Sequence, residues 1–187
     1  MKRSIIISLL FLILFNIPGF SQSADRERYG KTLNIGAGIG YYGFIGRPLP
    51  VIGLNIEFDV ARNFTLAPFA GFYSYRNDYY WGSYDRPFGN YSYRETVIPV
   101  GLKGSYYFDE LFRAGTPWDF YAGASIGFSF TSVVWDTDYY GDKTVTRDPR
   151  PLFLDAHIGA EYRFSERVGV FLDLSSGVST IGLGFHF

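Results

Sequence analysis

Hydrophobic and polar residues alternate with a period of two through most of the chain beyond residue 30. Because successive side chains of a β-strand point to opposite faces, this alternation predicts strands with one apolar and one polar face. No stretch in this region shows the period of an amphipathic helix. We therefore predict an all-β domain, with strands at 33–41, 52–60, 97–108, 120–131, 152–164, 168–174 and 181–187. An eighth strand, at 64–74, is apolar on both faces, so its register cannot be set from the pattern.

The two faces of these strands differ in charge as well as in hydrophobicity. The apolar face carries no charged residue, whereas the opposite face is rich in Gly and Ser and includes Glu57, Asp59, Lys103, Asp155, Glu161, Arg163 and Asp173. A Lys or Arg facing lipid at the bilayer midplane costs about 2 to 4 kcal/mol, and a tilted membrane strand needs about 9–11 residues. The pattern favours an eight-stranded antiparallel transmembrane β-barrel of the outer-membrane type. A soluble, lipocalin-like barrel with the apolar face inside and an apolar ligand is the alternative.

The predicted connections fall into a short and a long group. Residues 61–63 and 165–167 are tight turns, and 109–118 is a longer connection on the same side as the termini. The opposite side carries the long segments 75–93 and 135–150. Short periplasmic turns and long outer loops are typical of outer-membrane barrels.

The first residues have the features of an export signal. Lys2 and Arg3 precede an apolar run from Ile5 to Phe15, which is too short to span a bilayer. Small residues favour cleavage after Ser21, with Ser23 as the alternative. We predict a signal peptide at 1–21 and a barrel domain at 22–187, exported through the periplasm to the outer membrane.

Composition excludes several classes of function. The chain has no Cys, two His and a formal net charge of -1. There is no basic run to bind a phosphate backbone, so nucleic acid is not expected as a partner. Without Cys and with so few His, we expect no cofactor and no metal site. The acidic segment around Gly141 departs from the spacing of a calcium-binding loop.

Two segments resemble a known class of proteins. The last eight residues, Thr180–Phe187, are similar to the C-terminal assembly signal of bacterial outer-membrane barrels. Val97–Lys103 followed by Tyr106–Phe108 resembles a strand of the small OmpA-like, or porin family, eight-stranded barrels. The resemblance implies insertion by the barrel-assembly machinery and contact with outer-membrane lipid and lipopolysaccharide. It implies no substrate, because barrels of this kind support unrelated functions.

The polar face should form a filled interior. Because buried charges need partners, we predict that Lys103 and Arg163 pair with Glu57 and Glu161. His157 shares this face with Asp155 and Glu161, which raises the alternative of a barrel-embedded hydrolase. Such an enzyme needs a Ser beside the His, and a Ser-His-carboxylate geometry would distinguish it. We expect a structural cluster and no enzyme. We also expect a bulge at Pro68 and at Pro99, since Pro removes a donor from the ladder.

The outer segment 75–93 is rich in aromatic residues interleaved with Arg and Asp. Tyr, Trp and Arg are enriched in binding hot spots, so we predict partner binding at Tyr79, Tyr80, Trp81 and Tyr84. The alternative is an interfacial aromatic girdle with a self-packed tip. The sequence therefore predicts a barrel with a structural or partner-binding role. One such role is that of an accessory subunit of a larger outer-membrane complex.

Overall fold

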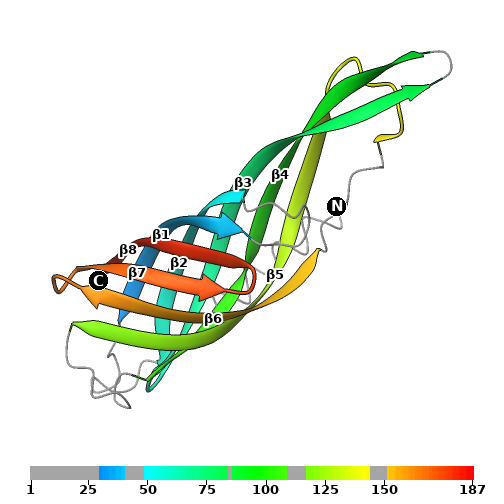
Figure 1. Cartoon of the computed structure of the whole chain (residues 1–187). Coiled ribbons are helices and arrows are strands. Elements are labelled where there is room, and N and C mark those ends of the chain that lie inside the picture. Colours follow the sequence, from blue (N-terminus) through cyan, green and yellow to red (C-terminus); the bar gives the residue numbers. More distant parts are fainter. Residues whose placement is uncertain (1–29, 41–48, 84–85, 109–116, 144–150) are drawn as a thin grey trace.

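Eight antiparallel strands form a closed barrel in the computed structural model, which describes residues 30–40, 49–83, 86–108, 117–143 and 151–187 (Figure 1). The strands are β1 (Lys31–Gly40), β2 (Leu49–Ala61), β3 (Phe64–Ser83), β4 (Arg86–Tyr107), β5 (Trp118–Trp135), β6 (Leu152–Arg163), β7 (Val168–Ser175) and β8 (Val178–His186). Each strand pairs with its neighbours in sequence, and β1 pairs with β8 to close the wall. The predicted signal peptide at 1–21 lies outside the described residues. Within the described residues no helix is long and apolar enough to cross a membrane.

The apolar face of the strands points outward and the charged face points inward. Ile52, Leu154 and Ile181 are 63%, 73% and 58% exposed, whereas Glu57 and Asp173 are 8% and 4% exposed. A lipocalin-like barrel would have the reverse arrangement, so that alternative is wrong. An apolar outer wall around a polar lumen is the arrangement that lipid requires.

The structure sets the register of β3, which the sequence left open. Thr65 and Ala67 are buried inside the barrel, and Phe72 is exposed on the outer face. Thr65 lies opposite Ser105 on β4, so the odd-numbered residues of both strands face the lumen. β3 could not be read from its pattern because its inward positions include apolar residues such as Ala67 and Phe69.

The two strand prolines do not produce the bulges that we predicted. The β3–β4 register is the same on both sides of Pro99, and the β2–β3 register is the same on both sides of Pro68. Each proline instead coincides with an interruption of pairing on one side, around Pro68 towards β2 and around Pro99 towards β3. The missing N–H therefore removes local pairing but leaves the alternation of side chains intact.

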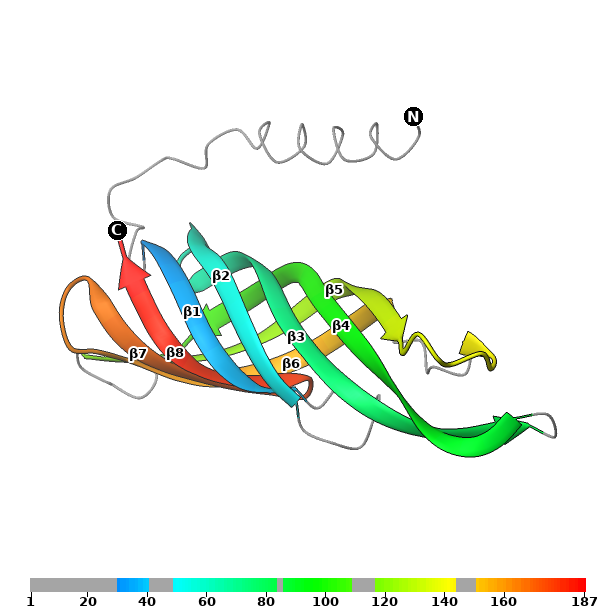
Figure 2. The same ribbon diagram turned by 90° about the horizontal axis from the view of Figure 1, so that it is seen from above.

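Three strands are much longer than the bilayer requires. β3, β4 and β5 have 20, 22 and 18 residues, whereas β7 and β8 have 8 and 9. The predicted outer loop at 75–93 is therefore mostly a β-hairpin, and only residues 84–85 fall outside the described part. Figure 2 shows β3 and β4 extending well beyond the rest of the barrel. About ten extra residues at about 3.3 Å each give a projection of about 30 Å.

Candidate functional site

The half of the lumen nearest the start of β1 and the C-terminus is filled by paired polar groups. Arg163 contacts Asp119 through two nitrogens, with Nε–Oδ2 and Nη2–Oδ1 distances of 2.8 and 3.0 Å. His186 Nε2 lies 2.7 Å from Glu161 Oε1, and its Nδ1 lies 3.0 Å from Thr32 Oγ1. These contacts satisfy charges that are removed from water.

Glu57 is held by hydroxyl groups. The Tyr107 hydroxyl donates to Glu57 Oε1 at 2.7 Å, and the Thr65 hydroxyl donates to the same oxygen. The Asn34 amide donates to Oε2 at 3.3 Å. Donors from β1, β3 and β4 thus converge on one carboxylate of β2 and fix the interior at this level.

The lumen ion pairs have different partners from those predicted. Lys103 pairs with Asp173, and Arg163 pairs with Asp119, so neither base is joined to Glu57 or Glu161 as we expected. The Lys103 ammonium also lies 4.4 Å from the centre of the Tyr121 ring. The prediction failed because alternation identifies the inward face but not the barrel stagger, which decides which inward residues stand at the same height.

Asp173 also orients a histidine next to a serine. His157 Nδ1 lies 2.8 Å from Asp173 Oδ1, and His157 Nε2 lies 2.9 Å from Ser125 Oγ. Because an ionised carboxylate only accepts hydrogen bonds, Nδ1 donates to Asp173, which leaves Nε2 as the ring nitrogen that shares a hydrogen bond with the Ser125 hydroxyl. The three residues come from β5, β6 and β7. Sequence analysis identified His157 but placed no serine beside it; the pairing of Gly123 with His157 brings Ser125, on the same face of β5, within reach.

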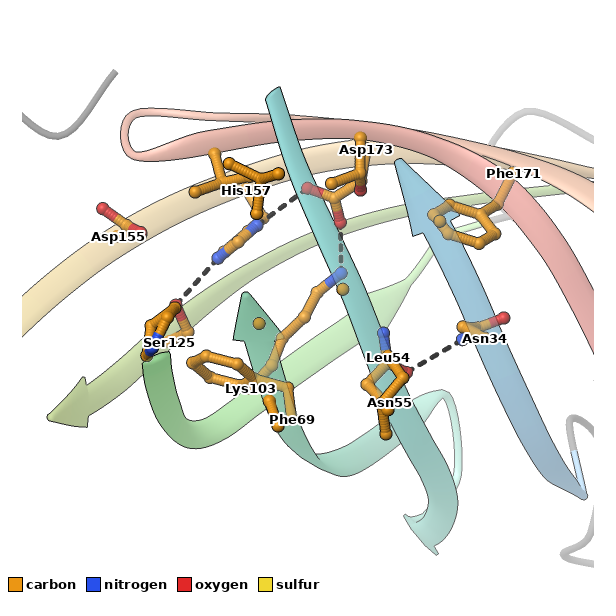
Figure 3. Close-up of a pocket in the computed structure, with 18 residues that line it drawn as sticks. Asn34, Leu54, Asn55, Phe69, Lys103, Ser125, Asp155, His157, Phe171 and Asp173 are labelled. Atoms are coloured by element: carbon orange, nitrogen blue, oxygen red, sulfur yellow. Dashed lines mark hydrogen bonds and ion pairs between the residues drawn. The ribbon is translucent and has the colours of Figure 1, made fainter. Parts of the chain in front are cut away.

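These residues border a cavity in the lumen. The cavity has a volume of about 90 Å³ and is lined by Ser125, His157, Asp173, Lys103 and Asn55 among others. Figure 3 shows the chain of contacts from Ser125 through His157 to Asp173, with Lys103 reaching Asp173 from another strand. Val51, Asp155 and Val178, which also line it, lie in the first four residues of β2, β6 and β8. Asn34, the fourth residue of β1, lines the cavity from the opposite end of the barrel. The cavity therefore extends from the level of Asn34 towards the end of the barrel that carries the hairpin.

An aromatic cluster joins the projecting β3–β4 hairpin to the segment that follows β5. Tyr139, in that segment, lies at the centre of the cluster. Tyr139 is 1% exposed, and its ring contacts those of Trp135, Tyr91, Trp81 and Tyr79 at centroid distances of 4.2, 5.3, 5.4 and 6.0 Å. Stacked and edge-on ring pairs of this kind stabilise a structure beyond their buried area. Two of the predicted binding residues, Tyr79 and Trp81, thus pack within this cluster.

Tyr80 lies on the other face of the hairpin. Its ring stacks on Phe88 with a centroid distance of 5.7 Å, and both side chains are 66% exposed. Tyr84, the fourth predicted binding residue, lies outside the described residues. The structure therefore divides the predicted group into rings that pack inward and a ring that faces outward.

The segment after β5 is fastened to the hairpin by Asp136. Its Oδ2 accepts hydrogen bonds of 2.8 Å from both the hydroxyl and the backbone N–H of Ser92. These bonds, with a smaller contribution from Arg76, lower the pKa of the Asp136 carboxyl. The fastening holds Tyr139 over the hairpin.

Comparisons with known proteins support the fold. No family model matches the chain, and no curated protein sequence matches it. Neisserial surface protein A has a TM-score of 0.53 and 12% identity, over 84% of this chain and 96% of that chain. The N-terminal β-barrel domain of Pseudomonas aeruginosa OprF gives a TM-score of 0.48 and 16% identity, over 84% of this chain and 98% of that chain. Ail, the attachment invasion locus protein of Yersinia pestis, gives 0.42 and 10%, over 84% and 96%.

At these identities the similarity to Neisserial surface protein A establishes the fold alone. The closed antiparallel barrel and its apolar outer wall agree with that fold. The chain has the fold of a small eight-stranded outer-membrane β-barrel, as the sequence predicted.

Proposed function

We propose that this protein resides in the outer membrane and binds a protein partner through its projecting β3–β4 hairpin. The observation that carries the proposal is the exposed Tyr80–Phe88 stack on strands that extend far beyond the length a bilayer needs. Residence in the membrane is supported by the continuous apolar outer wall.

The aromatic cluster around Tyr139 prepares the hairpin for binding. A two-stranded ribbon alone is only marginally stable in water. Here Tyr79 and Trp81 pack on Tyr139, which leaves Tyr80 on a supported strand and facing outward. A surface that is already ordered loses less conformational entropy when it binds, and exposed Tyr residues supply contact area at low entropic cost.

A protein is favoured over a charged glycan by the charge of the hairpin. Within 75–93, Arg76 and Arg86 balance Asp78 and Asp85. This segment has no excess positive charge with which to attract a sulfated or phosphorylated glycan.

The route to the membrane is part of the same proposal. Cleavage after Ser21 would release the barrel domain into the periplasm, and the C-terminal segment ending at Phe187 would be read by the barrel-assembly machinery. Contact with lipid and lipopolysaccharide follows from the apolar wall. A partner bound to the hairpin would make the protein an accessory subunit of a larger outer-membrane complex.

Site-specific photo-cross-linking in intact cells tests the proposal. A photoreactive phenylalanine analogue at Tyr80 should give a discrete protein adduct, and Phe88→Ala should reduce its yield at least tenfold. The matched control is the same analogue at Phe128, a 56% exposed residue of the lipid-facing wall. An equal yield of protein adduct at both positions would refute protein binding. Adducts with lipopolysaccharide alone would also refute it.

A further inference from the structure

The lumen holds two hydrogen-bonded chains of side chains, each of which links a hydroxyl, an imidazole and a carboxylate, and they differ in their surroundings. The first consists of Thr32, His186 and Glu161, and the second of Ser125, His157 and Asp173. All members of the second chain border the cavity, whereas none of the first is among the residues described as lining it. A network that only fills space needs no adjoining cavity.

The order of groups in the cavity chain is that of an activated nucleophile. Ser125 Oγ can transfer its proton to His157 Nε2, while Asp173 fixes the tautomer and supports the imidazolium that forms. Both distances, 2.9 and 2.8 Å, are within hydrogen-bond reach. Ser125 is 4% and Asp173 4% exposed, so the groups are shielded from bulk water.

We infer that Ser125, His157 and Asp173 form a hydrolytic site for esters with short acyl groups, with Ser125 as the nucleophile. The small volume of the cavity, about 90 Å³, favours a short acyl group over a long one. A cavity of roughly 150 Å³ holds benzene, so we expect an acyl chain of about two to three carbons here.

The reaction balances with water as the second reactant. Ser125 Oγ bonds to the ester carbonyl carbon as its proton passes to His157 Nε2, and the carbonyl electrons move onto oxygen. The alkoxide collapses, the bond to the alcohol oxygen breaks, and the alcohol leaves with the proton from Nε2. Water then cleaves the acyl-serine by the same route, which releases the acid and restores the hydroxyl. Lys103 and Asn55 line the cavity and can contribute positive charge and an amide donor to the alkoxide.

The test uses the full folded barrel in detergent micelles and in phospholipid vesicles, with p-nitrophenyl acetate and a small dialkyl fluorophosphate as probes. Intact mass and peptide mapping should place the phosphoryl adduct on Ser125 in the folded protein. Ser125→Ala should remove it, and His157→Gln should slow its formation by about 10²- to 10⁴-fold. Acetate esters should be hydrolysed faster than decanoate esters.

The Thr32–His186–Glu161 network, which lies away from the cavity, provides the matched controls. His186→Gln and Thr32→Val alter the same groups away from the cavity and should leave labelling of Ser125 unchanged. Ser129→Ala, on the same face of β5, controls for loss of a lumen hydroxyl. Every variant is first shown to be folded by heat-modifiable gel mobility.

Several results would overturn the inference. One is no adduct on Ser125 in folded protein, or an acetate hydrolysis rate in Ser125→Ala equal to that of Ser129→Ala. Another is labelling that is as fast in His157→Gln as in His186→Gln, which would make the contacts structural. A preference for the decanoate ester would reject the short acyl substrate.

Discussion

The Lys103–Asp173 ion pair should contribute strongly to the stability of the barrel. The side chains are 12% and 5% exposed, and Asp173 also accepts from Tyr121 at 2.8 Å and from His157 at 2.8 Å. Lys103→Met keeps the length of the side chain but leaves the carboxylate without its cation. Removing one partner of a buried pair costs about 3 to 5 kcal/mol, because the remaining charge stays buried without compensation.

The double variant separates this cost from simple loss of packing. Lys103→Met with Asp173→Asn removes both charges, and replacing a buried pair as a whole is often close to neutral. We therefore expect the free energy of unfolding of the double variant to exceed the value predicted from the sum of the single effects by at least about 2 kcal/mol. This coupling lies in the upper part of the range measured for residues in contact.

Equilibrium unfolding in urea, from phospholipid vesicles, measures these differences. The folded fraction is read from the heat-modifiable gel band and from tryptophan fluorescence, with folding and unfolding shown to give the same curve. Single-variant effects that simply add in the double variant would show that the contact contributes no coupling. The reasoning about uncompensated charge would then be refuted.

Three further perturbations have specific expected outcomes. Gly159→Ala would place a Cβ against the Tyr121 ring and should destabilise the barrel by about 1 to 3 kcal/mol in the urea assay; Gly53→Ala, whose Cβ would lie 3.8 Å from its nearest neighbour, Ala70 O, is the control and should change little. Tyr139→Ala should speed tryptic cleavage at Arg76 and Arg94 at least tenfold while the heat-modifiable band is retained, and unchanged cleavage would show that the cluster does not support the hairpin. Because the folded-state pKa of the Asp136 carboxyl is lowered, its fastening to Ser92 should be fully present above the ordinary Asp pKa of about 3.9 and be lost as pH falls through the lower folded value; hydrogen exchange at the Ser92 amide that accelerates already between pH 7 and 5 would contradict this.

The faces of the strands could be read from the sequence because lipid imposes a strict rule on them. Ile52, Leu154 and Ile181 occupy positions where a charge would be costly, so alternation alone assigns them to the outer wall. The strand ends were harder to read. Beyond the bilayer no such rule applies. The sequence of β3 around Tyr79 and Trp81 therefore resembled that of an aromatic loop. Only the packing of Tyr139, distant in sequence, shows why these residues remain in a strand.

The lumen contacts could be predicted only in part. Sequence alternation placed Lys103, Arg163 and His157 inside, and the structure confirms their location. Alternation could not predict Asp173 as the partner of Lys103, or Ser125 as the neighbour of His157. Those contacts join strands whose relative heights depend on the stagger of the barrel. Local pairing on β5 and β6 would have brought Ser125 into consideration once the register was known.

The long strands β4 and β5 also connect the hairpin to the lumen. β4 runs from the hairpin, where Ser92 holds the segment after β5, to Lys103 in the lumen, and its register with β5 is unbroken over that distance. β5 likewise continues from Trp135 in the aromatic cluster to Ser125 at the cavity. The aromatic cluster and the lumen site therefore share one continuous β4–β5 ladder. A substitution that shifted the register of these strands in the hairpin would displace Lys103 and Ser125 as well.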